Sequence, residues 1–379
     1  MELQDARNQI NEIDEQLVKL FQDRMELSKE IAVAKKGQNL PVYNRGRERE
    51  ILNSVCDLAG TDLESYVQVL YHAIFDVSRE YQQQIIGSGS KLPTDIAAAM
   101  EQTEAVFPSR AIVACQGIEG AHSQNACDKL FTLPNILYVN SFHGVFQAVE
   151  QGLCRFGVLP IENSTAGSVN EVYDLMKKHN FYIARSIKLR VDHNLLAKKG
   201  TKLADVKEIF SHQQAIDQCS DFLKSLEGVK VTACENTAVA AKMVAESPRT
   251  DVAAISSKNC ASLYSLTNLT DDIQNNDNNY TRFICISKDM QVYPGADKVS
   301  LMFSLSHKPG ALYSVLSRFS ALGLNLTKLE SRPVPGKDFE FLFYFDLDAS
   351  VADERVLKLL GEFDDEFDFT FLGAYSEVI

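Results

Sequence analysis

Apolar residues recur at spacings of three and four along the first part of the chain, a pattern typical of an amphipathic helix. The apolar stripe consists of Leu3, Ile10, Ile13, Leu17, Leu20, Leu27 and Ile31. Arg24 occupies a position of this stripe, and Arg7 and Lys35 lie at its edge, four residues from Leu3 and Ile31. Because a buried, unpaired cation is costly, three cations along one helix predict a site for a small, multiply charged anion. The alternative is that Arg7 and Lys35 reach solvent while Arg24 pairs with an acid of another helix.

The first helix is predicted to be long. The chain has no Pro or Gly between Glu2 and Lys36, and a helix of about 33 residues spans roughly 50 Å. A small domain cannot cover that length, so the pattern predicts a partner chain. We expect Gly37 and Pro41 to end the helix.

Two further helices are predicted before residue 90. One is expected over residues 44–58, and the next is expected to open with the capping box Thr61-x-x-Glu64. The apolar stripe of this last helix continues into two polar residues, Ser78 and Gln82. Polar groups on a face that points to a core need hydrogen-bonding partners there.

This polar set resembles the all-helical type of chorismate mutase domain over about residues 1–90. Its members here are Arg7, Arg24, Lys35, Asn44, Arg47, Glu48, Ser78 and Gln82. The resemblance implies an intertwined dimer with shared sites, in which Arg7 of the partner, Arg24 and Arg47 bind the carboxylates of chorismate. It also implies that Lys35 and Gln82 face the ether oxygen and that Glu48 holds the hydroxyl group, these three being the catalytic residues. The family often has Asp where this chain has Asn44, and a modest effect on substrate contacts is expected.

The implied chemistry agrees with these residue types. Chorismate rearranges to prephenate in one pericyclic step that uses no nucleophile and no metal. What helps is holding the reactive conformer and stabilising negative charge on the oxygen of the breaking C–O bond. Cations and amide donors on rigid helices supply both.

From about residue 110 the pattern changes to short strands that alternate with helices, which is typical of an α/β fold with open sheets. Strands are predicted over 111–115, 155–160, 208–211, 230–233, 252–255 and 284–286, and a helix over 170–179. Ligands of such folds bind at the carboxyl ends of strands. The polar segments that follow these strands are therefore candidate binding sites, although each alone is also compatible with a helix cap and a tight turn.

Three of these segments, and one that lies just before the strand predicted over 284–286, together resemble prephenate dehydratase over about residues 110–285, a fold of two α/β lobes with the active site between them. They are Gly117–Ser123, Pro160–Asn163, Ser211–His212 with Gln218–Cys219, and Thr281–Phe283. Ile118 and Gln213 replace the prolines usual in that family. The resemblance implies that Thr281 donates a proton or hydrogen bond to the leaving hydroxyl group. It also implies a substrate cleft lined by Asn163, Ser164, Thr165, Ser211 and Gln218, whereas Arg282 either pairs with a carboxylate or braces its turn.

The last eighty residues are predicted to alternate in the order βαββαβ, which is ferredoxin-like. The segments Pro309–Leu312 and Glu330–Pro333 resemble the ACT regulatory domain of prephenate dehydratases. That resemblance implies a phenylalanine site, in a paired domain, formed by Gly310, Ala311, Leu312, Asn325, Glu330, Ser331 and Arg332. The alternative is a docking domain that binds no ligand.

Composition narrows the function classes. The chain has 379 residues, enough for two or three domains, and a formal charge of −13 that argues against nucleic acid and anionic membranes as partners. Its eight Cys are scattered, with no pairing typical of metal sites, and no apolar run is long enough for a membrane span. We therefore expect a cytoplasmic protein with neither metal nor cofactor.

The combined prediction is a multidomain enzyme of phenylalanine biosynthesis that converts chorismate to prephenate and then to phenylpyruvate, under feedback by phenylalanine. The expected domains are residues 1–90 (mutase), 109–286 (dehydratase) and 298–379 (regulatory), with a linker over 91–108. A fusion with prephenate dehydrogenase is one alternative, but no Gly-x-Gly-x-x-Gly follows a predicted strand. A non-catalytic amino-acid sensor is the other. Channelling of prephenate, the oligomeric state beyond a dimer and the strength of feedback stay open.

Overall fold

The structure is a computed structural model that describes residues 3–38, 40–87, 89–305, 307–308, 310–333 and 341–378. The chain divides into two compact units. The first consists of Met1–Pro93, Leu305–Gly323 and Leu357–Asp368, and the second of Thr94–Ser304, Leu324–Val356 and Phe369–Ile379.

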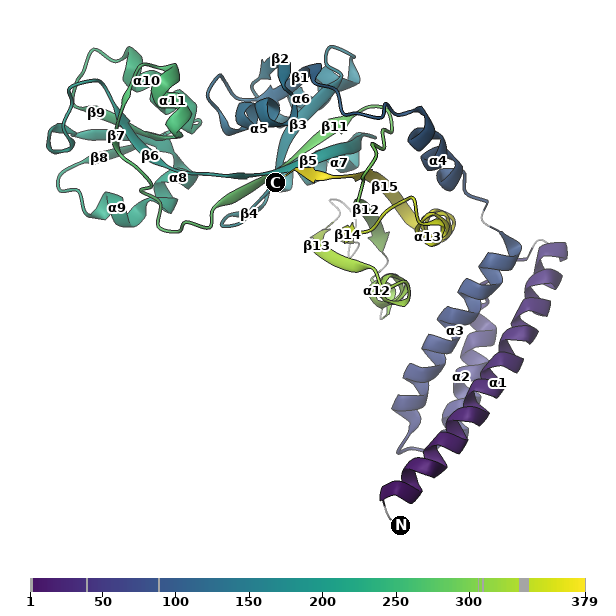
Figure 1. The fold of residues 1–379 in the computed structure, drawn as a ribbon. Coiled ribbons are helices and arrows are strands. Elements are labelled where there is room, and N and C mark those ends of the chain that lie inside the picture. The colour runs from purple at the N-terminus through teal and green to yellow at the C-terminus, as the bar shows by residue number, and fades with distance from the viewer. Residues whose placement is uncertain are drawn as a thin grey trace. The chain divides into compact units, whose positions relative to one another are not determined.

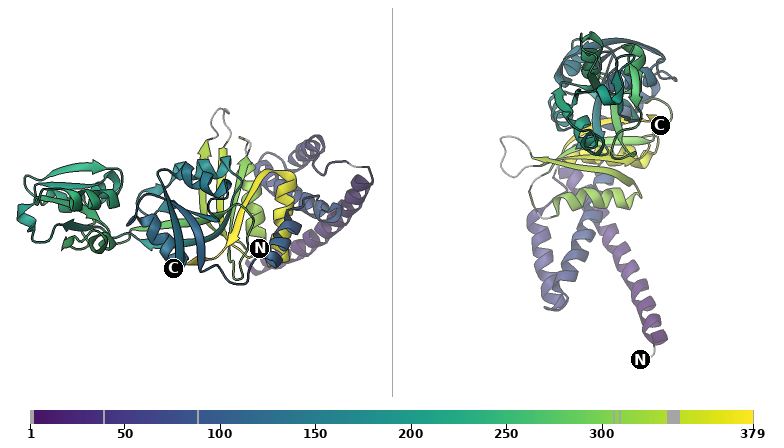
Figure 2. Two further views of the ribbon diagram at one scale, coloured as in Figure 1. Left: turned by 90° about the horizontal axis from the view of Figure 1, so that it is seen from above. Right: turned by 90° about the vertical axis from the view of Figure 1, so that its left-hand side faces the viewer.

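The N-terminal part of the first unit is a set of three long helices (Figures 1 and 2). They are α1 (Leu3–Gln38), α2 (Arg45–Ala59) and α3 (Glu64–Ile86), and α3 packs against both of the others. The three predicted helices are thus confirmed, with two errors at their ends. Helix α1 runs through Gly37 to Gln38, and α3 begins at Glu64 after a turn, so the predicted capping box does not form.

The apolar stripe of α1 is largely uncovered in the single chain. Leu20 is 64% exposed and Leu27 is 60% exposed, whereas Ala32 and Phe75 are among the few buried apolar residues of these helices. A stripe of this length exposed to water is unfavourable. The exposed stripe is what the sequence pattern predicts for one chain of a helical pair taken alone.

The second unit begins with α4 (Leu92–Gln102), which lies in the predicted linker, and then builds two sheets (Figure 1). The first sheet has the order β16-β5-β11-β3-β1-β2, with β4 paired to β3. Its strands are β1 (Arg110–Gln116), β2 (Leu133–Val139), β3 (Phe156–Asn163), β4 (Gly167–Ser168), β5 (Tyr182–Arg190), β11 (Tyr280–Ser287) and β16 (Glu377–Val378). Its helices are α5 (His122–Leu130), α6 (Phe142–Glu150) and α7 (Asn170–Lys178).

The second sheet has the order β10-β6-β9-β7-β8. Its strands are β6 (Asn194–Ala197), β7 (Glu208–His212), β8 (Lys230–Cys234), β9 (Val252–Ser256) and β10 (Thr267–Thr270). The helices are α8 (Gln213–Gln218), α9 (Ser220–Lys224), α10 (Thr237–Glu246) and α11 (Lys258–Leu263), with a short 3-10 turn, η1 (Leu203–Asp205). The chain crosses between the two sheets twice, over residues 191–193 and 271–279. The two-lobed α/β fold is confirmed.

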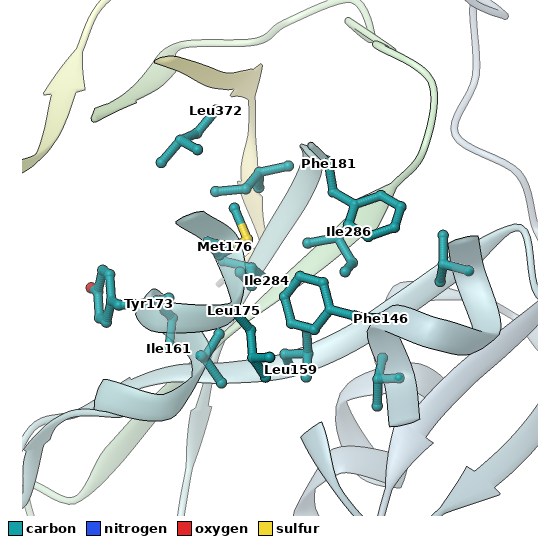
Figure 3. Close-up of a cluster of buried hydrophobic side chains, with 14 of the residues drawn as sticks. Phe146, Leu159, Ile161, Tyr173, Leu175, Met176, Phe181, Ile284, Ile286 and Leu372 are labelled. Carbon is teal, nitrogen blue, oxygen red and sulfur yellow. The ribbon is translucent and has the colours of Figure 1, made fainter. Parts of the chain in front are cut away.

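The core of the first lobe forms where α6 and α7 pack on β3 and β11. Phe146, Leu159, Met176, Ile284 and Ile286 are buried there and lie close together in Figure 3. Because this core holds β3 and β11 side by side, the polar residues at the ends of these two strands have fixed positions relative to each other.

The last part of the chain follows the predicted order βαββαβ. It consists of β12 (Lys298–Leu305), α12 (Ala311–Ala321), β13 (Asn325–Pro333), β14 (Phe341–Asp348), α13 (Glu354–Glu366) and β15 (Asp368–Tyr375). The four strands form one sheet in the order β13-β14-β12-β15. The turn predicted between β13 and β14 lies outside the described residues.

None of the described helices combines the length and hydropathy needed to span a bilayer.

Candidate active sites

Lys35 is held between two other parts of the helical domain. Its Nζ atom donates to Gln82 Oε1 of α3 at 3.1 Å and to the backbone carbonyl of Val42. Burial lowers the pKa of Lys35 from its ordinary value, and the negative charge of Glu48 opposes that change. The structure thus brings together three residues that the sequence assigns to one site, Lys35, Glu48 and Gln82.

Arg24 has a buried Nη1 atom with no hydrogen-bond partner among the described residues. Its guanidinium carbon lies 5.9 Å from the centre of the Phe75 ring, and burial lowers the pKa of Arg24. A ring face attracts a cation but does not neutralise it. Within the described residues, the predicted alternative of an ion pair for Arg24 is therefore not found, and the guanidinium is ready to bind an anion.

Ser78 accepts or donates a hydrogen bond with Ser28 of α1, and the two hydroxyl oxygens are 2.7 Å apart. Both residues are buried. Sequence analysis assigned Ser78 to the site but missed Ser28, which falls one position beyond the stripe residue Leu27. The serine pair fixes the distance between α1 and α3 next to Arg24, whose backbone carbonyl accepts from Ser28.

Glu48 forms a bidentate ion pair with a residue that the sequence analysis missed, Arg79 of α3. Arg79 Nη1 donates to both carboxylate oxygens, at 2.5 and 2.7 Å, and the same guanidinium pairs with Asp76 and lies over the ring of Tyr43. Arg79 follows the predicted site residue Ser78, but its own position lies off the apolar stripe. Periodicity alone therefore gave no reason to select it.

The remaining mutase residues lie away from this group in the single chain. Arg7 is exposed on α1. The side chain of Arg47 is 68% exposed and pairs with Glu50, and Asn44 caps α2 by accepting from the backbone N–H of Arg47. An exposed Arg7 agrees with the expected role of reaching a second chain.

The dehydratase residues Thr281 and Asn163 pair across two neighbouring strands, β11 and β3. Asn163 Nδ2 donates to Thr281 Oγ1 at 2.9 Å. Asn163 Oδ1 accepts from the backbone N–H groups of Thr165 and Ala166 at 3.0 and 2.8 Å. Because a backbone N–H only donates, these two contacts fix which end of the amide faces Thr281. The predicted position of Thr281 just before a strand was wrong, since β11 already begins at Tyr280.

A chain of hydrogen bonds continues from Asn163 into the second lobe. Asn163 Nδ2 also donates to Asn279 Oδ1 at 2.9 Å, and Asn279 Nδ2 donates to Gln218 Oε1 at 3.1 Å. Gln218 Oε1 lies 2.8 Å from Nε2 of His193, and burial lowers the pKa of that imidazole. Asn279 and His193 were missed by the sequence analysis, although Asn279 is only two residues from Thr281.

Next to this chain is a cavity of about 300 Å³. The residues that line it are Thr165, Ala166, Gln214, Asp217, Gln218, Gln274, Asn275, Asn276 and Asn279. Thr165 and Gln218 are there as predicted. Two other predicted residues use their hydroxyl groups within the fold, since Ser164 Oγ donates to the Asn278 carbonyl and the buried Ser211 Oγ donates to the Ile255 carbonyl.

The predicted segment Gly117–Ser123, which follows β1, joins the two lobes. Gly120 has a φ of 92°, and a Cβ atom there would lie 2.9 Å from Sγ of Cys260 in α11. The turn leads into His122. Burial is the main cause that lowers the pKa of His122 to about 4, and the charge of His193 lowers it further. The imidazole of His122 is therefore neutral near pH 7. Among the described residues, no three His, Cys, Asp or Glu side chains cluster as a metal site requires.

Arg282 points to the C-terminal sheet and is not brought together with the cleft residues. Its guanidinium pairs with Asp346 of β14, donates to the Tyr375 hydroxyl at 2.6 Å and has Nε 3.1 Å from Glu377 Oε2. Sequence analysis left two roles open for Arg282, pairing with a carboxylate or bracing its turn. In the structure Arg282 pairs with carboxylates, and these belong to the protein itself. Successive side chains of a strand point to opposite faces, so Thr281 and Arg282 serve different surfaces.

This network predicts a large effect of Arg282→Met on stability. The substitution leaves the largely buried carboxylate of Asp346 without its cation and leaves Glu377 with Lys188 alone, which is expected to lower the free energy of unfolding by about 3–5 kcal/mol. Urea denaturation of the full chain measures the loss. Arg190→Met is the control, since Arg190 is half-exposed and pairs with Asp192, and such pairs contribute about 0–1 kcal/mol. Equal shifts for both variants would contradict the prediction.

The predicted phenylalanine residues lie in both units. Gly310 has a left-handed backbone conformation and precedes α12, whose first residues are Ala311 and Leu312. Asn325 donates to Asp348, and Ser331 is exposed on β13.

Two more of these residues contact the dehydratase lobe. Glu330 accepts from Ser168 Oγ at 2.8 Å, and Arg332 donates to Asp174 at 3.0 Å. Strand β13 therefore contacts the segment that directly follows Asn163.

Comparison with known proteins finds relatives of both parts of the chain. The family models of chorismate mutase type II and of prephenate dehydratase match residues 6–83 and 113–291. A bifunctional chorismate mutase/prephenate dehydratase of Aquifex aeolicus is 32% identical over 100% of this chain and 99% of its own length. The chain belongs to this bifunctional family. It is therefore an isomerase and a lyase, and the dehydrogenase and sensor alternatives are set aside.

Other relatives match about three quarters of the chain or slightly less. Arogenate dehydratase 2 of Petunia hybrida is 37% identical over 76% of this chain and 77% of its own length. The crystal structure of prephenate dehydratase from Arthrobacter aurescens in complex with L-Phe is 28% identical, with a TM-score of 0.64 over 70% of this chain and 89% of that one.

Proposed function

We propose that the two sites of this bifunctional enzyme act in sequence, and that the residues described above perform the two steps. The observation that carries the first assignment is the buried Nη1 atom of Arg24, which has no partner among the described residues and lies on the same helix as Lys35, the donor to Gln82. These groups supply two cations and an amide from α1 and α3, as the dianion chorismate requires.

In the first site, hydrogen-bond polarity assigns the roles. Gln82 accepts from Lys35 through Oε1, so its Nε2 group is free to donate to the ether oxygen of chorismate. Lys35 uses two donors on Gln82 and Val42 and keeps a third for the same oxygen. Both donors strengthen as negative charge builds on that oxygen in the transition state. Glu48, held by Arg79, accepts from the substrate hydroxyl group.

In the second site, Thr281 acts on the leaving hydroxyl group of prephenate. Its Oγ accepts from Asn163, so its own proton is directed elsewhere and is free for the leaving oxygen. Loss of CO2 and of the hydroxyl group then forms the aromatic ring of phenylpyruvate. A Thr hydroxyl is a weak acid, so the contribution is a hydrogen bond that stabilises the departing oxygen.

The C-terminal domain is proposed to bind phenylalanine, as the enzyme from A. aurescens does. Gly310, Ala311, Leu312, Asn325 and Ser331 would frame the ligand, with Glu330 and Arg332 beside it. The last two already bind Ser168 and Asp174 of the dehydratase lobe. Any rearrangement of β13 on ligand binding would therefore change contacts of the segment after Asn163, which is a route for feedback.

A second copy of the chain is proposed to cover the apolar stripe of α1. This predicts that Leu20→Asp, at a position 64% exposed in the single chain, produces monomers and lowers mutase activity, because Arg7 of the partner is lost from the site. Sedimentation measures the oligomeric state. Val33→Asp is the matched control, since Val33 is 58% exposed but lies off the stripe. A Leu20→Asp variant that stays dimeric would rule out this interface.

The sequential function is tested by supplying chorismate to the full chain and following prephenate and phenylpyruvate, with and without phenylalanine. We expect phenylpyruvate to form and added phenylalanine to suppress it. If the reaction stops at prephenate, the roles assigned to the second site are wrong. If phenylalanine has no effect, the regulatory assignment is wrong and the C-terminal domain is a docking domain.

A further inference from the structure

We propose that the side-chain amides of Gln218 and Gln274 bind an acceptor group of the dehydratase substrate through N–H donors alone, and that they thereby select prephenate over arogenate. This inference rests on the proposed function of the cleft. It adds Gln274 as a substrate-binding residue and Asn279 and His193 as positioning residues.

The orientation of Gln274 follows from one contact with the backbone. The N–H of His193 donates to Gln274 Oε1 at 2.9 Å. Since that N–H only donates, the oxygen of the amide must face it, and Nε2 must face the other way. Gln274 Nε2 is buried and has no hydrogen-bond partner among the described residues.

The orientation of Gln218 follows in the same way from a longer series of hydrogen bonds. Two backbone N–H groups fix Oδ1 of Asn163, so its Nδ2 donates to Asn279 Oδ1 at 2.9 Å. The amide of Asn279 therefore presents its own Nδ2 to Gln218 Oε1 at 3.1 Å. His193 Nε2, 2.8 Å from the same oxygen, must carry a proton.

Gln218 is consequently left with Nε2 as its free end. This nitrogen is also buried without a partner among the described residues.

The two free N–H2 groups belong to residues that line the same cavity of about 300 Å³. Two unpartnered donors in one place are costly in a folded protein and are typical of a site that a ligand completes. Of the residues that line the cavity only Asp217 is charged, and it is exposed and accepts from Gln213 at 2.9 Å. A ligand that carries hydrogen-bond acceptors therefore meets amide donors in this cavity and no cation.

The two candidate substrates differ at one group. Prephenate carries a keto oxygen, an acceptor, where arogenate carries an ammonium group, which only donates. Their carboxylates are acceptors in both. Two amides of residues that line the cavity, each with its free end a donor, would attract the keto acid side chain and repel the ammonium group, so their orientation would discriminate between the two substrates.

The decisive variant is Asn279→Asp, which is expected to reverse the orientation of the Gln218 amide at the end of this series of hydrogen bonds. A carboxylate has no donor for Gln218 Oε1, so Gln218 turns its Nε2 to the new carboxylate and its Oε1 to the cavity. We expect kcat/KM for prephenate to fall about 10- to 100-fold, mainly through KM. We also expect the ratio of kcat/KM for prephenate to that for arogenate to fall, because the inverted oxygen accepts from the ammonium group.

Asn276→Asp is the control. It adds the same charge to the same cavity, and the hydrogen bond that Asn276 Oδ1 accepts from the N–H of Asn278 is one that a carboxylate keeps. Its change in the substrate ratio measures the effect of charge alone. If Asn279→Asp does not fold, Gln274→Glu replaces it, since a carboxylate still accepts from the His193 N–H while presenting oxygen to the cavity.

The experiment measures both substrates with the full chain, and urea denaturation of each variant reports the folding of the dehydratase lobes. The inference is supported if the wild type prefers prephenate and Asn279→Asp reduces that preference more than Asn276→Asp does. A wild-type preference for arogenate, or equal changes in the two variants, overturns it. If the wild type converts neither substrate, the proposed function of the cleft fails instead.

Discussion

Replacing Thr281 by Val is expected to stop phenylpyruvate formation while prephenate accumulates from chorismate. Val keeps the branched shape on β11 but has no hydroxyl group, and the Nδ2 donor of Asn163 loses an acceptor that lies 2.9 Å away. Removing a positioned donor for a leaving oxygen is expected to lower the rate of the second step by about 10²–10⁴-fold. Following both products from chorismate in one reaction shows the effect.

The same reaction contains its own control. Chorismate consumption should be unchanged, because Thr281 lies in the second unit and the mutase residues lie in the first. Thr281→Ser keeps a hydroxyl group and is expected to retain most of the dehydratase activity. A Thr281→Val enzyme that makes phenylpyruvate at the wild-type rate would remove Thr281 from the mechanism.

Replacing Lys35 by Met is expected to abolish prephenate formation while prephenate that is supplied directly is still converted. The substitution removes the donor to the ether oxygen and also frees Gln82, which Lys35 now contacts at 3.1 Å. Loss of such preorganised donors is expected to lower the mutase rate by about 10²–10³-fold. Separate assays with chorismate and with prephenate resolve the two steps.

The matched control is Lys36→Met. Lys36 is the next residue of α1 and is exposed, so the variant changes the charge of the helix equally but leaves the site intact. A similar loss of mutase activity in both variants would mean that the overall charge of the helix, and not the placed ammonium group of Lys35, accounts for the rate.

The sequence pointed to the residues of the helical group because two periodic helices carry most of them. Arg24, Ser78 and Gln82 fall on apolar stripes and Lys35 lies at the edge of one, and a polar residue in such a position is conspicuous. Arg79 lies off the stripe and was missed. Its importance arises from the packing of α2 against α3, which a single-helix pattern does not describe.

The dehydratase site was only partly predictable for a similar reason. Asn163 and Thr281 were identified from their motifs, but Asn279, Gln274 and His193, which connect Asn163 and the cavity through hydrogen bonds, lie in the two crossings between the lobes. Polar residues in such connecting segments are ordinarily turn residues. Only the folded chain, in which β3 pairs with β11, shows that these polar residues are joined by hydrogen bonds.

Arg282 shows a case in which the sequence contained the answer. Alternation along a strand implies that neighbours face opposite sides, so a cleft-facing Thr281 already places Arg282 on the other face. Sequence analysis treated Thr281–Phe283 as a turn before the strand and therefore lost that inference. The error in the strand boundary became an error in the expected role.

Strand β16 has a practical consequence for engineering. It is the last described part of the chain, yet it pairs with β5 in the catalytic sheet and supplies Glu377 to Arg282. Truncation before the regulatory domain would thus remove an edge strand of the dehydratase lobe, exposing β5 as a site for aggregation. A feedback-resistant enzyme should therefore be sought by point substitutions in β13, with the C-terminus kept intact.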